Sequence, residues 1–164
     1  MAGRFVFWSL LGCLLAACAS TPSLTSYLDH RWELRKGDYF ERQYMAEGTH
    51  FSLYHKAKVM PVSLEYLKDP EDFEREDLRQ LRTEFQSILE ARLSEVYEVL
   101  DQRVQPDYQT VVISPALTYI DTPDRVTHAV SSAVILIPLT SGVSAFEAKI
   151  TEGETGIILA EIAE

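Results

Sequence analysis

The chain has 164 residues and carries 15 basic against 25 acidic side chains, a formal net charge of −10 at pH 7. Nucleic-acid binding depends on clustered Lys and Arg that displace counterions, and the absence of such a cluster excludes a nucleic-acid partner. An anionic membrane surface would also repel this charge, so membrane attachment would have to come from lipid. The length suits about one domain with a sizeable core.

Residues 1–17 predict a lipoprotein signal peptide. Arg4 supplies positive charge, and Phe5 to Ala17 is a 13-residue apolar stretch. A membrane-spanning helix needs about 20 apolar residues, so this stretch fits a secretory signal instead. Its end, Leu15-Ala16-Ala17-Cys18, resembles the lipobox of bacterial lipoproteins. The resemblance implies cleavage between Ala17 and Cys18 and acylation of Cys18 by a diacylglyceryl group and an amide-linked chain such as palmitate.

Two alternatives exist for this segment. Cys13 follows Leu10-Leu11-Gly12, but Leu11 is bulky where a small residue is usual, so Cys18 is favoured. The second alternative is an ordinary cleaved secretory signal, in which Cys18 is incidental. Each buried methylene of a lipid contributes about 0.8 kcal/mol, and two or more chains anchor a protein stably. With Cys13 removed and Cys18 acylated, the mature domain has neither a disulfide nor a thiol.

Residues 18–26 predict the lipidated Cys and a flexible tether, because the sequence after Cys18 is small, polar and contains Pro22. Residues 27–164 then form a single periplasmic α/β domain. Its first part, Tyr27 to Glu47, is rich in charges and aromatic residues without a clean period. We expect an extended arm whose aromatic side chains pack on the domain edge, with a helical turn at Arg31 to Lys36.

A strand followed by a long helix comes next. Phe51 to Leu67 predicts the strand, with Pro61 at an edge or at the strand's start. Asp69 and Pro70 fit the cap and the first position of a helix. The helical spacing of the following apolar residues indicates an amphipathic helix on a sheet, rather than half of a coiled coil. These residues are Leu78, Leu81, Phe85, Ile88, Leu89, Leu93, Val96 and Leu100.

The remainder of the chain predicts strands. Tyr108 to Asp121 is one strand, in which Pro115 marks a bulge or an edge. Val126 to Leu139 is buried and is either helix or strand, although its β-branched residues favour strand. Ser144 to Thr151 and Ile157 to Glu164 predict a β-hairpin. In its first strand, Phe146, Ala148 and Ile150 are expected to face inward, and Glu147, Lys149 and Thr151 outward.

These elements predict an α+β fold. It is a two-layer sandwich in which one long amphipathic helix packs on a mixed or antiparallel sheet of about four to five strands.

The sequence contains no recognisable catalytic or metal site. The histidines are His30, His50, His55 and His128, and none stands at zinc-ligand spacing from a Cys or acidic partner. Ser131 and Ser132 lie near His128 but beside an apolar run that favours packing. The acidic cluster from Asp69 to Asp77 lacks the glycine of a calcium-binding loop and is better explained as a helix start. We therefore expect no enzyme activity, no cofactor and no metal.

Several short motifs occur in a distinctive order. They are the lipobox, Lys56-Ala57-Lys58-Val59-Met60-Pro61-Val62, the long helix, Ile113-Ser114-Pro115-Ala116-Leu117-Thr118, Ile137-Pro138, and Ala148-Lys149-Ile150 with the Thr155-Gly156 turn and Leu159-Ala160. From Tyr44 to Glu164 this order resembles the bacterial lipoproteins of a domain-of-unknown-function family, number 3313. The resemblance implies an envelope lipoprotein whose α/β domain is similar to those of curli-secretion and penicillin-binding-protein-activator lipoproteins. It implies no catalytic residues.

The resemblance also bears on location and on the end of the chain. In lipoproteins of enterobacterial type, Asp after the lipidated Cys retains the protein at the inner membrane, whereas Ala19 stands here. We therefore expect the periplasmic face of the outer membrane. Family members continue past the hairpin, so we expect a truncated C-terminus with an unpaired strand edge. The alternative is a compact variant with the hairpin as its natural edge.

Three functional interpretations remain. The favoured one is a non-catalytic binding or assembly module with a protein partner in the cell envelope. The second is a carrier of small apolar ligands, which requires an enclosed apolar pocket between helix and sheet. The third is an envelope hydrolase, which requires a cleft where His and acid converge.

Overall fold

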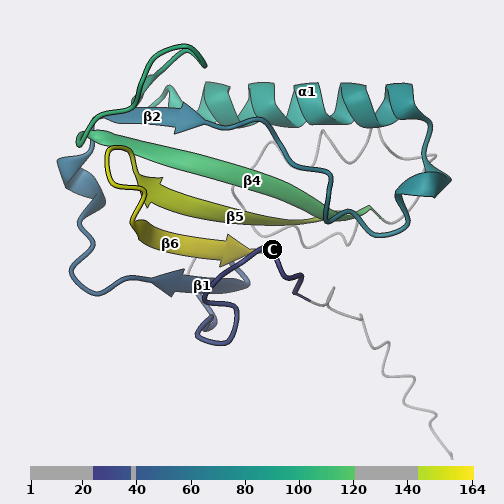
Figure 1. Ribbon diagram of the computed structural model, residues 1–164, viewed down its shortest axis with the longest axis horizontal. Coiled ribbons are helices and arrows are strands. Elements are labelled where there is room, and N and C mark those ends of the chain that lie inside the picture. Colours follow the sequence, from purple (N-terminus) through teal and green to yellow (C-terminus); the bar gives the residue numbers. More distant parts are fainter. Residues whose placement is uncertain (1–23, 38–39, 121–143) are drawn as a thin grey trace, which may run out of the picture.

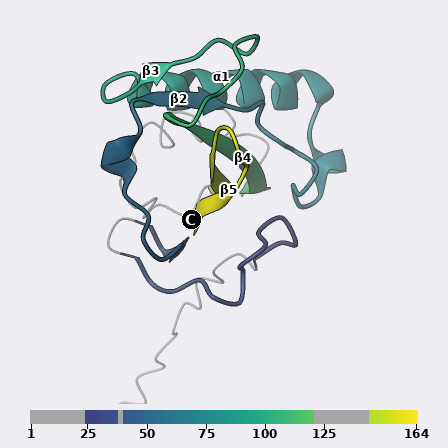
Figure 2. The same cartoon turned by 60° about the vertical axis from the view of Figure 1, so that its left-hand side comes forward.

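The computed structural model describes residues 24–37, 40–120 and 144–164 (Figure 1). One helix, α1 (Arg75–Leu93), lies along one face of a six-stranded mixed sheet (Figures 1 and 2). The strands are β1 (Arg42–Met45), β2 (Lys56–Val59), β3 (Glu98–Val99), β4 (Thr110–Ile120), β5 (Ser144–Glu152) and β6 (Ile158–Ala163). The predicted α+β class is confirmed, with more strands than expected.

The sheet has the order β1-β6-β5-β4-β2-β3. β3, β2 and β4 run parallel, whereas β4, β5, β6 and β1 alternate in direction. β1 and β3 were missed in the sequence because strands of four and two residues are too short to show a period. The predicted hairpin is confirmed as β5 and β6. β6 lies between β5 and β1, so its outer edge is paired, contrary to the expected unpaired edge.

The predicted start of the long helix is wrong. Asp69 has a left-handed backbone conformation (φ 51°) and precedes a separate 3₁₀ turn, η2 (Pro70–Asp72), without a side-chain capping bond. Phe73 is extended, which interrupts the helical path, and α1 begins at Arg75 with Glu74 as its N-cap. Pro70 does occupy the first position expected of it, but in the short turn.

The predicted end of the helix is also too late. α1 ends at Leu93, and Val96 is 77% exposed. The chain then reaches the outer edge of β2, where the Glu98 N–H donates to the His55 carbonyl and the Leu100 N–H donates to the Ala57 carbonyl. This pairing gives hydrogen-bond partners to backbone groups on the outer edge of β2. These groups would stay unpaired if α1 continued for another turn.

The predicted first strand shortens to β2. Phe51 to Leu53 form a 3₁₀ turn, η1, and Pro61 lies beyond the end of β2. Pro115, expected at an edge or bulge, lies inside central β4, and the register shift falls between Leu117 and Tyr119. The hydrogen bonds of Ser63 explain how a proline fits inside β4. The Ser63 N–H donates to the Pro115 carbonyl, and the Ser63 carbonyl accepts from the Leu117 N–H. These bonds need no donor at Pro115 itself.

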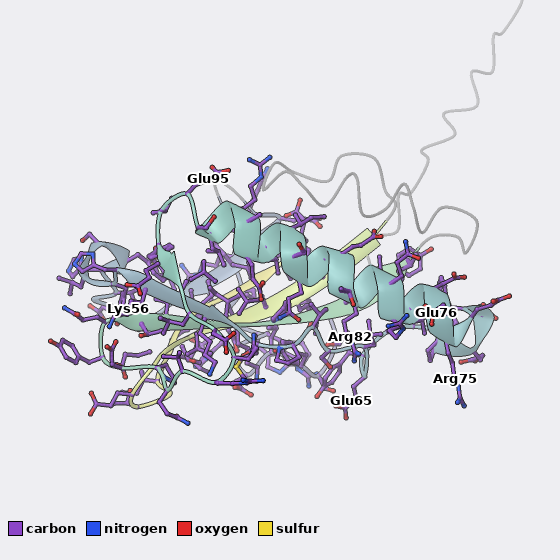
Figure 3. All side chains as sticks on the ribbon, turned by 90° about the horizontal axis from the view of Figure 1, so that it is seen from above. Lys56, Glu65, Arg75, Glu76, Arg82 and Glu95 are labelled. Atoms are coloured by element: carbon purple, nitrogen blue, oxygen red, sulfur yellow. The ribbon has the colours of Figure 1, made fainter. Side chains whose placement is uncertain are left out.

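The core fills the space between α1 and the sheet. Leu81 and Phe85 project from the helix, and the Phe85 ring meets Phe146 edge-on with centroids 5.7 Å apart. The predicted packing of the helix on a sheet is therefore confirmed. Charged side chains such as Arg82 and Glu76 are exposed on the helix (Figure 3). In the described residues, α1 is the only α-helix, and it is not apolar enough to cross a membrane.

Several predictions lie outside the described residues. These are the signal peptide, the cleavage site at Ala17, the lipidation site at Cys18 and most of the tether. The conformation of Val126 to Leu139, together with His128, Ser131 and Ser132, lies outside them as well.

Candidate functional site

Two carboxylates are buried on the face of the sheet opposite α1. Alternation along β5 and β6 places Glu147 and Glu161 on this face, because Phe146, Ala148 and Ile162 belong to the core on the other. Glu147 is 2% exposed and Glu161 is 0% exposed. Glu147 points away from the core, as expected, but its side chain is buried. An N-terminal segment, residues 24–35, covers it and is called the arm below.

The arm binds both carboxylates through hydrogen bonds, an arrangement called the clamp below. Thr25 donates its backbone N–H to Glu147 Oε1 at 2.7 Å and its hydroxyl to Oε2 at 2.6 Å. The N–H groups of Asp29 and His30 donate to Glu161 Oε1 at 2.8 Å and Oε2 at 2.7 Å. Each carboxylate oxygen therefore has a donor, which offsets the cost of burying the charge.

Small neighbours make room for the arm. Glu147 lies opposite Ala163 on β6 and Ala116 on β4. Because alanine projects only one carbon above the sheet, these positions leave space in which the Thr25 segment reaches the Glu147 carboxylate. The approach of the arm thus follows from the side-chain sizes on three adjacent strands.

Tyr27 fixes the middle of the arm. Its hydroxyl donates to the Ser114 carbonyl of β4 at 2.7 Å, and its ring lies 5.1 Å from that of Tyr66. Burial raises the pKa of Tyr27 to about 12. The Lys149 ammonium lies 5.1 Å from the centre of the Tyr27 ring. The arm is therefore held at its centre as well as at the two carboxylates.

His30 and Glu161 bring an imidazole and a carboxylate together. His30 Nδ1 lies 3.4 Å from Glu161 Oε2 and has no hydrogen-bond partner. The imidazole stacks on Tyr44 with ring centroids 4.1 Å apart and nearly parallel planes. Since both Glu161 oxygens accept from backbone N–H groups of the arm, this carboxylate serves to hold the chain.

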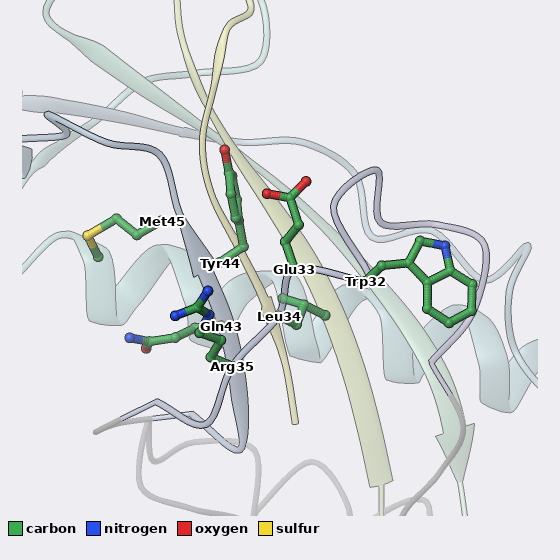
Figure 4. Close-up of a pocket in the computed structure, with 7 residues that line it drawn as sticks. All are labelled: Trp32, Glu33, Leu34, Arg35, Gln43, Tyr44 and Met45. Carbon is green, nitrogen blue, oxygen red and sulfur yellow. The ribbon is translucent and has the colours of Figure 1, made fainter.

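Beyond His30 the arm turns and forms a groove with β1. The Glu33 N–H donates to the His30 carbonyl at 2.7 Å. Arg35 and Gln43 then exchange two backbone hydrogen bonds, of 2.8 and 2.7 Å. Gly37 lies close to the same strand, because a Cβ there would meet the end of the Gln43 side chain. The resulting cavity of about 430 Å³ is called the edge groove below (Figure 4).

Polar groups and exposed side chains line the edge groove. Its residues are Trp32, Glu33, Leu34, Arg35, Gln43, Tyr44 and Met45. Trp32 is 85% exposed and Met45 is 52% exposed. Figure 4 shows Trp32 at one end, Met45 at the other, and Arg35 beside Gln43 between them. The groove therefore offers an aromatic surface at one end of a row of hydrogen-bonding groups.

Sequence reasoning named no residue of the clamp or the edge groove as functional. It anticipated only that aromatic residues of the arm would pack on the domain, as Tyr27 does on Tyr66. The available signal was an acid between apolar neighbours in each hairpin strand: Glu147 lies between Phe146 and Ala148, and Glu161 lies between Ala160 and Ile162. Among residues 24–37, 40–120 and 144–164, no three His, Cys, Asp or Glu side chains come together as a metal site.

Comparisons with known proteins give one family, and solved structures that include two PelC dodecamers. The family model described as "Protein of unknown function (DUF3313)" matches residues 29–164. No curated protein matches the chain. The dodecamer of a PelC point variant from Paraburkholderia phytofirmans, in space group C2, is similar at 12% identity and a TM-score of 0.40, covering 74% of this chain and 78% of that one. A PelC dodecamer from the same organism in space group P6 is similar at 11% identity and a TM-score of 0.39, covering 74% and 76%.

Proposed function

Since this chain belongs to the DUF3313 family of proteins of unknown function, we propose a role from its own residues: a lipid-anchored envelope protein that acts as a non-catalytic binding or assembly module. Its anchor is lipid on Cys18. Ala19 directs it to the outer membrane, at the periplasmic face. Its partner is a component of the cell envelope, and the edge groove is the surface that meets this partner.

The clamp is the observation that carries this proposal. A lipid on Cys18 reaches Thr25 through seven residues, which span at most about 25 Å when fully extended. From Thr25 to His30 the arm is fixed to the sheet by four hydrogen bonds to buried carboxylates. The next residues of the arm form one wall of the edge groove. The clamp therefore ties the position of the groove to that of the anchor.

The chemistry of the two acids supports a non-catalytic role. General acid–base catalysis requires a carboxyl group within reach of a substrate proton. Glu147 and Glu161 are instead buried under the arm and accept hydrogen bonds from it. The apolar-carrier interpretation has less support, because core side chains such as Phe85 and Phe146 fill the space between helix and sheet.

Acylation and fractionation test the anchor. Cells carrying the wild-type chain, Cys18→Ser or Cys13→Ser are labelled with palmitate and separated on a sucrose gradient. We expect Cys18→Ser to lose the label and accumulate as precursor, whereas Cys13→Ser is processed normally and stays with outer-membrane markers. Ala19→Asp should move the protein to the inner membrane. Normal labelling of Cys18→Ser would contradict the proposed anchor.

Site-specific photocrosslinking tests the binding role. A photoreactive residue replaces Met45 in the edge groove or Ser87 on the exposed side of α1. In intact cells we expect a discrete adduct from position 45 and none from position 87. Equal adducts from both positions would show that the groove is not a preferred contact surface.

A further inference from the structure

We propose that the edge groove binds a neutral glycan, with one pyranose ring stacked on Trp32 and neighbouring sugar hydroxyls hydrogen-bonded by Glu33, Arg35 and Gln43. The inference rests on the proposed function and names the ligand class of that binding module. Its starting point is Trp32, whose large apolar ring is 85% exposed beside polar groups. The Arg31 guanidinium lies over one face of this ring, 4.7 Å from its centre, so the sugar would stack on the other face.

The aromatic end of the groove fits a sugar ring. An indole is a flat apolar surface with a single polar N–H. A pyranose has a face of C–H groups and a rim of hydroxyls, so it can cover the indole while its rim meets polar side chains. Figure 4 shows the remaining groove residues extending away from Trp32 toward Met45. The volume of about 430 Å³ lies in the usual range for small-molecule sites.

The polar groups of the groove favour a neutral ligand. The Glu33 carboxylate only accepts hydrogen bonds, the Arg35 guanidinium only donates, and the Gln43 amide does both. A hydroxyl both donates and accepts, so a row of hydroxyls satisfies all three side chains. Local charges of both signs lie around the groove, Glu33 against Arg31 and Arg35, so no single ligand charge suits them all, and the net charge of −10 opposes an anionic ligand.

The backbone of the groove disfavours a peptide that adds a strand. Such a peptide requires unpaired N–H and C=O groups along the edge of β1. The N–H and C=O of Gln43 are both already bonded to Arg35, which occupies the middle of that edge. Recognition in this groove therefore depends on side chains.

The clamp preorganises the aromatic wall of the groove. Asp29 and His30 are bonded to Glu161, and the His30 ring stacks on Tyr44, which itself lines the groove. Trp32 follows two residues later. Because this part of the arm is fixed before a ligand arrives, binding a glycan loses little chain entropy.

Tryptophan fluorescence tests the proposal on the full chain, purified in a detergent without a sugar headgroup. The sequence has two tryptophans, and the proposed cleavage before Cys18 removes Trp8, so Trp32 is the only reporter in the mature chain. The probes are chitotetraose, cellotetraose, a polygalacturonate fragment and an extended Val/Thr peptide. We expect a saturable blue shift with at least one neutral oligosaccharide. A response to chitotetraose alone identifies acetamido sugars, and a response to both neutral probes identifies pyranosides in general.

Variants locate the binding, measured by calorimetry. We expect Trp32→Ala to abolish the binding heat and Gln43→Ala or Glu33→Gln to weaken affinity about tenfold, as for the loss of one good hydrogen bond. Tyr108→Ala is the matched control, because Tyr108 is 66% exposed and lies outside the groove. Thermal melts confirm that each variant is folded.

Three results would overturn the glycan assignment: no response to neutral oligosaccharides, stronger binding of the anionic fragment or the peptide, or an equal loss with Tyr108→Ala. If crosslinking from position 45 persists in any of these cases, the binding module stands and only its ligand class fails.

Discussion

Lys149 on β5 lies directly opposite Glu161 on β6, yet its ammonium group pairs with Asp29 of the arm, at 2.8 Å. The Glu161 carboxylate instead accepts the backbone N–H groups of Asp29 and His30. The arm thus brings an acid to the lysine and two amide donors to the buried acid. The arm therefore both buries the two carboxylates of this face and supplies the donors that offset their burial.

The clamp predicts a specific loss of stability. In Glu161→Gln, one carboxylate oxygen becomes an NH₂ group, which faces a backbone N–H and cannot accept from it. We expect a loss of about 1–3 kcal/mol in the free energy of unfolding, together with faster proteolysis within the arm. Urea unfolding and protease digestion measure the two effects. Glu154→Gln, at the exposed hairpin turn, should change stability by less than about 0.5 kcal/mol, and equal losses in both variants would contradict the clamp.

The helix core predicts a contrast along α1. Phe85 is 4% exposed and meets Phe146, so Phe85→Ala should cost about 3–5 kcal/mol of unfolding free energy. Ser87 is exposed on the same helix, and Ser87→Ala should stay within about 0.5 kcal/mol. Denaturant unfolding of both variants provides the test. Similar small effects would mean that α1 does not pack on β5.

Asp107 predicts a dependence on acidic pH. The Lys56 ammonium at 2.6 Å and the Thr110 hydroxyl lower the pKa of Asp107 from 3.8 to about 2. A lowered folded-state pKa contributes stability above the unfolded pKa, and this contribution is lost as pH falls through the folded value. Asp107→Asn should therefore be less stable than wild type above about pH 4, and the difference should shrink toward pH 2. Urea midpoints across this range test it, and a constant difference would contradict it.

Tyr27 makes the stability of the fold depend on alkaline pH. Its contribution is lost as pH rises, whereas that of Asp107 is lost as pH falls. The pKa of Tyr27 rises from 10 to about 12, chiefly because burial disfavours the phenolate. A raised folded-state pKa gives stability that is present below the unfolded pKa and is lost as pH rises through the folded value. From pH 10 to about 12, wild type should therefore lose stability more steeply than Tyr27→Phe. Urea unfolding across this range measures the slopes, and equal slopes would refute the buried position of the phenol.

The backbone around Gly153 is packed too closely to leave room for a Cβ atom. A Cβ here would lie 2.6 Å from the Asp107 carbonyl oxygen and 2.9 Å from Pro106 Cβ. Gly153→Ala must displace this backbone, and we expect a loss of about 1–3 kcal/mol. Gly48→Asn is the control, because Gly48 has a positive φ that Asn tolerates and open space around it. Thermal unfolding compares them, and a larger loss at Gly48 would contradict the argument.

The sequence predicts most of the helix-facing half of the fold. Apolar residues such as Leu81 and Phe85 repeat at helical spacing, and Phe146 and Ala148 alternate along a strand, so periodicity alone identifies the faces that meet. The end of α1 could not be found in this way. Its apolar pattern continues through Val96 and Leu100, but pairing with β2 claims Glu98 and Val99 for the sheet.

The clamp and the groove could not be predicted for a different reason. Alternation shows that Glu147 points away from the helix, but its exposure depends on a segment more than a hundred residues earlier. The exposed Trp32 is recognisable as a binding residue only when Arg35 and Gln43 have been brought beside it by β1. Both features come from contacts between segments that carry no pattern in common.

The same long-range contacts set the order in which the domain is completed. The bonds of the clamp join residues that are 122, 131 and 132 positions apart, and β1 pairs with β6 over a similar separation. Closing such long loops is entropically expensive and slows folding, so local elements such as α1 form sooner. The N-terminal arm, first to emerge during synthesis, must wait for β6 before it can dock. The edge groove therefore forms only after the arm and β1 have docked on β6. A chain that has not finished folding would not bind the ligand.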